Sequence, residues 1–440
     1  MDYRTVIKGC FIAMFYLCSL AEAFADPHFV VISNTNASPP YLTWDTAATN
    51  IQSAINEATG GDTVIVSSGT FRPPAQLVVT NGITLCSANG SSNTTVNGNS
   101  SHSCFLVNHA NAVVDGFTIT GGSASAGAGV AMGNGTIRNC LITGNTATSS
   151  GGGLYATNGL VENCIFNGNH APSAAGAYLY QGGMLRNCLF WSNLATGGGG
   201  GGVGCNKGGT LQNCMICYNN ATTNGGGLFV SSNTVVRNTI VYFNTCSAGV
   251  SSNYYNSQTN WTYDHCCLSP LLAVNGNIDT DPLFAIDLAH PYHLQAGSPC
   301  VDAGTEIGVS PADKDGVGRP LDGNADGVAA TDIGPYEFIN SIADSDHDGQ
   351  TDTNEVTAGT DPTDSNSVFE VSATKESQNF ILTWASASNR IYDLSRLADL
   401  TDLAGATNLS LDMPATPPWN YYTDAVDQTI GFYRLTVTHP

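Results

Sequence analysis

A twelve-residue stretch, DSDHDGQTDTNE at Asp344–Glu355, places acidic residues at a spacing that suits a divalent cation. It fits the pattern D-x-D-x-D-G-x5-E, in which carboxylates, one backbone carbonyl and a closing glutamate surround calcium. The predicted calcium ligands are Asp344, Asp346, Asp348, Gln350, Asp352 and Glu355. Asp361 and Asp364, in the GTDPTDSNS that follows, are candidates for a second ion. The alternative is a solvated acidic linker without metal.

Three other places hold residue types that could act on a substrate. Glu162 is the only carboxylate between Asp115 and Asp264, and so isolated an acid suggests catalysis. Lys207 follows six consecutive glycines and could be the base of a lyase, and Asp264 is adjacent to His265. Glycoside hydrolysis generally needs two carboxylates that flank one bond, and Glu162 has no second acid near it in sequence. Lys207, Asp264 and His265 are kept as weak catalytic candidates.

Aromatic residues near the C-terminus could contact a sugar. Trp419, Tyr421 and Tyr422 lie in PATPPWNYYTD, a segment that its prolines predict to be a loop. They could form a platform on which a sugar ring stacks. The alternative is that they fill the core of a small domain, since large aromatic side chains dominate such cores.

The body that carries these candidates is a repeat. IRNCLITGN at 137–145 recurs as VENCIFNGN, LRNCLFWSN, LQNCMICYN and VRNTIVYFN, with GGGL-like motifs on the same period. A period of about 24 residues is typical of stacked repeats. Short alternating apolar runs between glycines and asparagines indicate strands and turns. About 24 residues suffice for one coil of three short strands, so we expect a parallel β-helix of roughly eight coils.

Alignment of the coils gives Glu162 a structural interpretation. The residue before each recurring asparagine forms one column, which reads Asp115, Arg138, Glu162, Arg186, Gln212, Arg237 and Asp264. Opposite charges on neighbouring coils attract, by ~0–1 kcal/mol for an exposed pair, and they penalise slips in register. Glu162 is therefore predicted to belong to this charged column.

Cysteines form another column, at Cys140, Cys164, Cys188 and Cys214. Successive coils lie ~4.8 Å apart, which brings neighbouring Cα atoms within the range of a disulfide. A buried stack of free thiols is the interpretation that we favour, because free cysteine packs as a small apolar residue. Bridged pairs are the alternative.

The ends of the stack need covers, because unpaired strand edges invite aggregation. NIQSAINEA at Asn50–Ala58 has the apolar spacing of a helix and is predicted to cap the N-terminal end.

The sequence divides into four parts. We expect a signal peptide at 1–25, the β-helix with its cap and closing segment at 26–340, an acidic calcium-binding linker at 341–367, and a small β-sandwich-like domain at 368–440.

The N-terminus and the charge bear on location and partners. Arg4 and Lys8 precede the apolar run Gly9–Leu20 and the sequence AFA, a pattern typical of a secretory signal cleaved before Asp26. No later apolar run is long enough to span a bilayer. The net charge is −22, and residues 302–366 hold 15 acids and 2 bases, which argues against nucleic-acid binding. We expect a monomer that is secreted, extracellular or associated with the outer membrane.

Several motifs resemble known families. The repeats resemble those of secreted right-handed parallel β-helix proteins of the pectate-lyase-like superfamily, and the GGGL and FNGN pairs resemble chlamydial polymorphic outer membrane proteins. The stretch from DPLF at Asp281 to DIGPYEF at Phe338 resembles the closing segment of choice-of-anchor Q proteins. The acidic loop resembles bacterial thrombospondin type 3-like repeats. The β-helix resemblance covers about Ile51–Phe338 and implies fold and export, but no single activity.

Together these features favour an exported protein that binds or adheres to polysaccharide at the cell surface, with calcium ordering its linker. The first rival is a polysaccharide lyase or glycoside hydrolase with its site on a coil face. The second is a calcium-stiffened spacer without a ligand. A lysine with adjacent acids on one face would favour the enzyme, whereas a row of aromatic side chains would favour binding.

Overall fold

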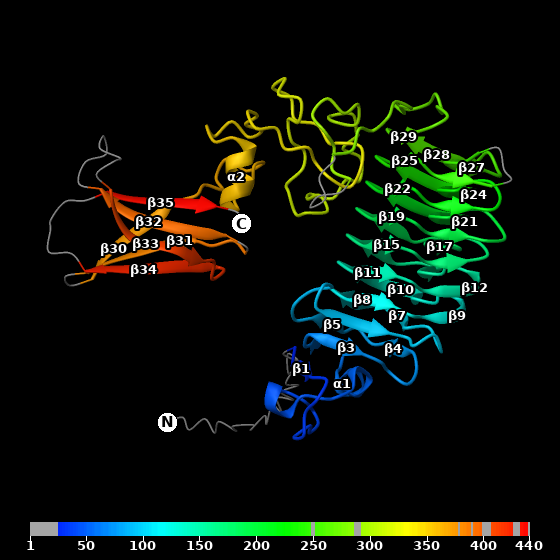
Figure 1. The fold of residues 1–440 in the computed structure, drawn as a ribbon, viewed down its shortest axis with the longest axis horizontal. Helices are drawn as coiled ribbons and strands as arrows, with labels where there is room; N and C mark the ends of the chain where they lie inside the picture. Colours follow the sequence, from blue (N-terminus) through cyan, green and yellow to red (C-terminus); the bar gives the residue numbers. More distant parts are fainter. Residues whose placement is uncertain are drawn as a thin grey trace, which may run out of the picture.

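The structure is a computed structural model, which describes residues 25–247, 251–285, 292–376, 379–388, 390–397, 406–425 and 432–438. Residues 1–24, which hold most of the expected signal peptide, lie outside the described residues. Figure 1 shows a stack of parallel coils, a group of loops at one end of it, and separate sheets near the C-terminus. About eight coils form the stack, and only two α-helices accompany the strands of the described chain, which confirms the predicted parallel β-helix.

The first sheet is the largest, and its fourteen strands pair in parallel. Its strands are β1 (Pro27–Val30), β2 (Thr63–Val66), β4 (Leu77–Val79), β5 (Thr84–Ser87), β7 (Phe105–Asp115), β10 (Val130–Arg138), β13 (Leu154–Ala156), β14 (Leu160–Glu162), β17 (Ala177–Leu179), β18 (Met184–Arg186), β21 (Val203–Gln212), β24 (Leu228–Arg237), β27 (Tyr254–Asn256) and β28 (Trp261–Asp264). In some coils this side is one long strand, and in others a short turn divides it in two.

Two smaller parallel sheets close the coils. The second sheet has nine strands: β3 (Gly69–Phe71), β6 (Thr94–Asn97), β8 (Thr118–Thr120), β11 (Leu141–Thr143), β15 (Ile165–Asn167), β19 (Leu189–Trp191), β22 (Met215–Cys217), β25 (Ile240–Tyr242) and β29 (Cys267–Leu268). The third sheet has six: β9 (Ser123–Ala126), β12 (Thr146–Ser150), β16 (His170–Ala171), β20 (Leu194–Ala195), β23 (Asn220–Ala221) and β26 (Thr245–Cys246).

The two asparagines of each repeat have different roles. The first stands at the corner between the first and second sheets in the left-handed conformation, with φ between 43° and 54° at Asn139, Asn163, Asn187, Asn213 and Asn238. Asparagine tolerates this conformation better than other residues with a side chain. His265 has the same conformation, with φ of 49°, on the last coil. The first asparagine therefore sets the corner of the coil.

The second asparagine of each repeat forms a buried chain of hydrogen bonds along the stack. Its side-chain amide donates to the side-chain oxygen of its equivalent on the next coil, at 2.9–3.0 Å. The members of this asparagine ladder are Asn145, Asn169, Asn193, Asn219 and Asn244, and Asn253 ends it. Because these polar groups are buried, each bond avoids the cost of an unpaired amide.

The charged column is confirmed as a structural feature. Glu162 pairs with Arg138 and Arg186 in strand register, and Arg186 Nη2 lies 2.7 Å from Glu162 Oε1. Arg138 pairs with Asp115 at 2.7 Å, and Arg237 pairs with Asp264 at 3.3 Å. The column is therefore a series of separate ion pairs, and Glu162 belongs to one of them.

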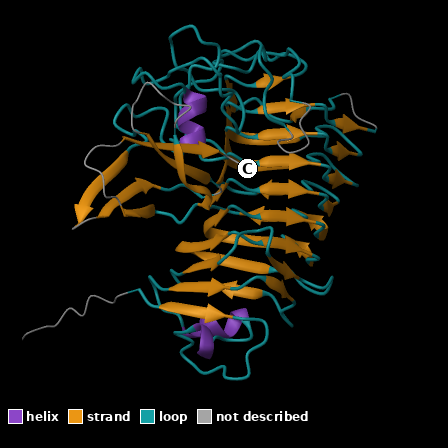
Figure 2. Ribbon diagram, turned by 60° about the vertical axis from the view of Figure 1, so that its left-hand side comes forward, coloured by secondary structure: helices purple, strands orange, loops and turns teal. Residues whose placement is uncertain are grey.

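The expected N-terminal cap and thiol stack are present. Helix α1 (Ile51–Glu57) buries Ile51, Ala54 and Ile55 against the end of the core, and Figure 2 shows it at one end of the stack. Asn50 caps the helix by accepting a hydrogen bond from the Gln52 amide at 2.8 Å. A 3-10 helix, η1 (Trp44–Thr46), precedes it.

The four thiols of the cysteine column, which belong to Cys140, Cys164, Cys188 and Cys214, are buried in one core. Their free state in solution stays a prediction.

The closing segment folds back onto the outer side of the second sheet. Its Leu294, Cys300, Ile333 and Tyr336 form a core with five residues of four neighbouring coils, which are Leu189, Met215, Cys217, Ile240 and Cys267. Its acids bind backbone amides: Asp332 Oδ2 accepts from Phe338 N at 2.6 Å, and Asp313 Oδ2 accepts from Glu337 N at 3.0 Å. These acids therefore hold the segment in shape.

The C-terminal residues form two three-stranded antiparallel sheets around a core that includes Trp384 and Tyr392. One sheet contains β30 (Val371–Glu376), β31 (Asn379–Ala385) and β34 (Trp419–Ala425). The other contains β32 (Ile391–Leu397), β33 (Thr407–Pro414) and β35 (Phe432–Thr438). The expected loop at PATPPWNYYTD is wrong in its second half, because β34 begins at Trp419 and pairs with β31.

Candidate functional site

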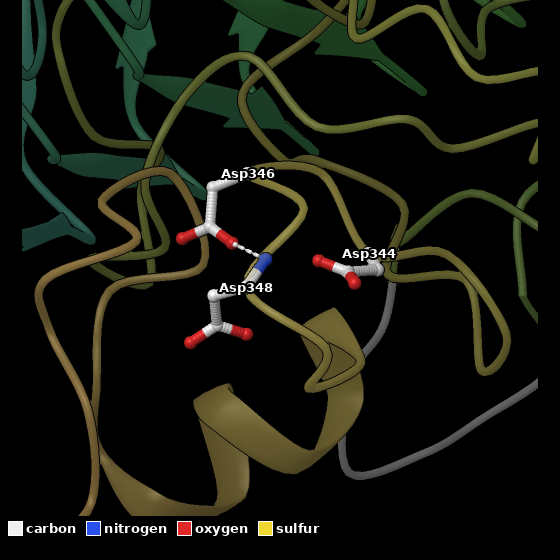
Figure 3. A group of neighbouring side chains, drawn as sticks. All are labelled: Asp344, Asp346 and Asp348. Atoms are coloured by element: carbon white, nitrogen blue, oxygen red, sulfur yellow. Dashed lines mark hydrogen bonds between the residues drawn. The ribbon is translucent and has the colours of Figure 1, made fainter.

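The acidic loop brings three aspartates together. One carboxylate oxygen from each of Asp344, Asp346 and Asp348 lies within 4.8 Å of the others. Figure 3 shows the three side chains on the loop that precedes helix α2 (Asp352–Ala358). The loop is wound by its own hydrogen bonds: Asp344 Oδ2 accepts from Gly349 N at 3.0 Å, and Asp346 Oδ1 accepts from Asp348 N at 3.1 Å. Gly349 has φ of 97°, a conformation that suits glycine. The sequence spacing therefore folds into a compact group of oxygens.

Several oxygens of this loop are buried without a hydrogen-bond donor in the described part of the chain. They are Asp344 Oδ1, Asp346 Oδ2 and Glu355 Oε2. An unpaired buried polar atom costs ~1–3 kcal/mol, more when it is charged. Glu355 is only 2% exposed, and burial together with Asp346 and Asp348 raises its pKa to about 7. A hard cation would supply the missing partner, so these residues fit calcium.

The other predicted ligands lie in different positions. Asp352 is buried and binds Ser345, whose backbone amide and hydroxyl donate to it at 2.8 and 2.7 Å. The backbone N–H of Gln350 donates to Asp348 Oδ1 at 2.7 Å, and the backbone carbonyl of Gln350 stays the candidate ligand. Asp361 and Asp364 each accept a hydrogen bond from the backbone amide two residues later, and neither belongs to the three-aspartate group. A second ion stays a prediction.

Helix α2 (Asp352–Ala358) connects the acidic loop to the C-terminal sheets. Arg390 donates from Nε to Thr357 O and from Nη2 to Val356 O, both at 2.7 Å. A guanidinium at this end of a helix satisfies carbonyls that lack a partner within the helix. The order of the loop is thereby linked to the position of the C-terminal domain.

The catalytic candidates of the body do not form a single site. Asp264 Oδ1 lies 2.8 Å from His265 Nδ1, and Asp264 Oδ2 is the partner of Arg237. Lys207 lies on β21, two strands away in the first sheet, with its Nζ 5.3 Å from the centre of the Tyr180 ring. Within the described residues, Lys207 forms no ion pair with a carboxylate. The lysine with adjacent acids that would favour a lyase is therefore not found among these residues.

The C-terminal aromatic residues divide between surface and core. Trp419 is 57% exposed and Tyr421 is 75% exposed, on the outer face of β34. Tyr422 points inward, packs against the core and donates its hydroxyl to Leu409 O at 3.1 Å. The core interpretation therefore holds for Tyr422, and Trp419 and Tyr421 are the residues available to a ligand.

A second group of aromatic side chains was not identified from the sequence. Tyr155, Tyr178 and Tyr180 lie on the outer face of the first sheet, with ring centres 5.5–5.9 Å apart. Tyr155 follows the GGGL motif of its coil, and Tyr178, the last residue of AGAY, takes the same register position on the next coil. Alignment of that column would have shown the row.

Comparisons with known proteins describe the architecture. The sequence matches no protein-family profile and no curated protein. Among solved structures, pectate lyase Pel9A is 14% identical with a TM-score of 0.42, over 71% of this chain and 96% of that protein. A pectin methylesterase from Aspergillus niger is 11% identical with a TM-score of 0.34, over 59% of this chain and 91% of that protein. The chain is a parallel β-helix protein, and these similarities assign no activity to it.

Membrane-spanning helices were also sought. Neither helix of the described ranges combines the length and the apolar character that a bilayer crossing requires.

Proposed function

We propose that this chain is an exported, non-catalytic protein that binds polysaccharide at the cell surface, and that calcium orders the loop before its C-terminal domain. The observation that carries the proposal is the exposure of Trp419 and Tyr421 on one face of β34. Burial of such a ring in a core would stabilise the fold by about 1.5–3 kcal/mol. Two exposed rings on one strand therefore favour contact with a ligand.

The surroundings of these rings suit a sugar. Residues two apart on a strand point to the same side at a spacing of ~6.8 Å. In register beside Tyr421 and Trp419 stand Thr383 and Ala385 of β31, and Ser372 of β30 pairs with Thr383. Small and hydroxyl-bearing neighbours leave the rings uncovered and offer hydrogen bonds. A pyranose has an apolar C–H face and a polar rim, which matches such a surface.

The alternative of a lyase or a glycoside hydrolase has less support. Glu162 and Asp264 are both engaged with arginines, and the Lys207 ammonium faces a tyrosine ring. A glycosidase needs two carboxylates on opposite sides of one bond. The support for calcium is separate, and it rests on the three unpaired carboxylate oxygens of the acidic loop.

A polysaccharide array together with assays for reducing ends and unsaturated products tests the proposal. The protein should bind one class of glycan and release no product. The double variant Trp419→Ala/Tyr421→Ala should bind at least ~10-fold more weakly, because an aromatic contact contributes about 0.5–1.5 kcal/mol beyond its area. Leu411→Ala is the matched control, since Leu411 is 54% exposed on the other C-terminal sheet. Product release, or equal binding by the double variant, would contradict the proposal.

A further inference from the structure

Three tyrosines and a lysine gather on the outer face of the first sheet. Tyr155 and Tyr180 are stacked with ring centres 5.8 Å apart, and Tyr178 lies 5.5 Å from Tyr155 and 5.9 Å from Tyr180. All three rings are half-buried, and the residues that flank them point inward, as at Leu154 and Leu179. We call Tyr155, Tyr178, Tyr180 and Lys207 the tyrosine–lysine patch.

The sequence of the next coil keeps the patch open. Tyr178 pairs in register with Gly204 of β21. A Cβ atom at Gly204 would lie 2.7 Å from Ala174 Cβ and 3.3 Å from Tyr178 Cδ2, so a side chain here would clash with Ala174 and crowd the Tyr178 ring. The closing segment covers a different side of the stack, the second sheet.

Lys207 gives this surface its charge. It is exposed, and its backbone amide donates to Tyr180 O at 3.1 Å, which places the lysine directly above that tyrosine. Its Nζ lies 5.3 Å from the Tyr180 ring centre, a cation–π distance. In contrast, Arg138, Arg186 and Arg237 are each paired with a carboxylate. Lys207 is therefore a positive charge free to meet an acidic group of a ligand.

The aromatic column continues along the stack. Beyond Gly204 the same register position holds Phe229 and then Tyr255, which stack with ring centres 5.6 Å apart. From Tyr155 to Tyr255 there are four coil steps, or ~19 Å. A row of this length parallel to the axis suits a polymer better than a single small molecule.

We propose that the tyrosine–lysine patch binds a polysaccharide that carries acidic substituents, with sugar rings on the tyrosines and a carboxylate or sulfate on Lys207. The inference rests on the proposed function only in taking the ligand to be a glycan. The net charge of −22 does not oppose it, because Glu162 is the only acid between Asp115 and Asp264 and is itself paired with Arg186. More distant acids are largely screened beyond ~10 Å in physiological salt.

The test uses the whole chain on an array of neutral, carboxylated and sulfated polysaccharides. The variants are Lys207→Gln and Tyr178→Ala/Tyr180→Ala. The matched control is Lys375→Gln, since the Lys375 ammonium also lies over a ring, 5.8 Å from the centre of Phe380 in the C-terminal domain. Lys207→Gln should weaken binding to acidic glycans by roughly tenfold and flatten its dependence on salt, whereas Lys375→Gln should change neither.

Each outcome has a defined meaning. Loss of binding to carboxylated glycans alone, or to sulfated glycans alone, identifies the substituent that Lys207 meets. Equal binding by wild type and Lys207→Gln at every salt concentration overturns the inference. If Trp419→Ala/Tyr421→Ala abolishes binding while Lys207→Gln has no effect, only this inference fails. If the wild type binds no glycan, the proposed function fails with it.

Discussion

Replacement of Glu355 by glutamine should have opposite effects on the acidic loop in the absence and in the presence of calcium. Without metal, Glu355 is buried beside Asp346 and Asp348 with Oε2 unpaired, so removal of its charge should make the loop more resistant to protease. With calcium, the same substitution removes the closing glutamate that supplies two oxygens, and the protection should fall.

The size of the effect follows from binding linkage. Calcium sites in extracellular modules have dissociation constants of ~10⁻⁴–10⁻³ M. At about 10 mM free calcium, binding would stabilise the ordered loop by RT ln(1 + [L]/Kd), which is ~1.4–2.7 kcal/mol. Cleavage that depends on transient opening should slow by ~10–100-fold. The coils of the β-helix should melt at nearly the same temperature in both conditions, because the predicted calcium ligands at 344–355 lie outside the coil strands.

Limited proteolysis within residues 340–367 measures this, with chelator in one series and calcium in the other. Glu376→Gln is the control, because Glu376 is an exposed acid on β30 outside the loop. Calorimetry gives the affinity directly. Equal cleavage of the wild type in both series, with no heat of calcium binding, would refute the reasoning. Equal calcium protection of wild type and Glu355→Gln would show that Glu355 is no ligand.

Four further outcomes are expected. Glu162→Gln should lower the free energy of unfolding, measured by chemical denaturation, by no more than ~1 kcal/mol. It should leave glycan binding unchanged, and a loss of binding in the folded variant would indicate a functional role for Glu162. The four thiols of the cysteine column, at Cys140, Cys164, Cys188 and Cys214, should all be alkylated after unfolding without reductant, as measured by mass spectrometry. Quantitative disulfide formation among them would contradict the predicted stack of free thiols. Asn193→Ala should cost ~2–5 kcal/mol, because it removes the acceptor of the Asn169 backbone and side-chain amides and a donor to Asn219 Oδ1, and a loss below ~1 kcal/mol would show that the ladder contributes little. Burial, together with the nearby Asp313, raises the pKa of Glu337 from 4.5 to about 7, although Arg319 and the Asp332 backbone amide oppose the shift. The proton on Glu337 therefore stabilises the closing segment fully below pH 4.5, and this stabilisation is lost as the pH rises through 7. Thermal unfolding should occur at a lower temperature at pH 8 than at pH 5, and the reverse order would contradict this sign.

The features that the sequence predicted are those in which one residue position repeats with the coil. The period fixes which residues are stacked, so the charged column and the thiol stack could be predicted from the sequence. The capping face of α1 was predicted from the helical spacing of its own apolar residues. The acidic loop was also readable, because its acids and its glycine lie within twelve residues and the turn is local.

The features that the sequence did not predict depend on contacts between distant segments. The prolines before Trp419 predicted a loop, but pairing with β31 makes Trp419–Ala425 a strand. That pairing decides which side chains face outward, so Tyr421 is exposed and Tyr422 packs against the core. The path of the closing segment across the second sheet depends on Asp313 and Asp332, whose hydrogen bonds join residues that sequence spacing does not relate.

The asparagine ladder makes one coil the natural unit by which this protein could change in length. Each ladder amide donates to the coil that follows and each side-chain oxygen accepts from the coil that precedes, so the chain of bonds has a direction. Insertion or deletion of one whole repeat would join a donor to an acceptor again, whereas a partial repeat would break the chain and shift every later column. Variation among related proteins should therefore come in steps of about 24 residues, and each step would lengthen or shorten the outer face by one sugar-sized increment of ~4.8 Å.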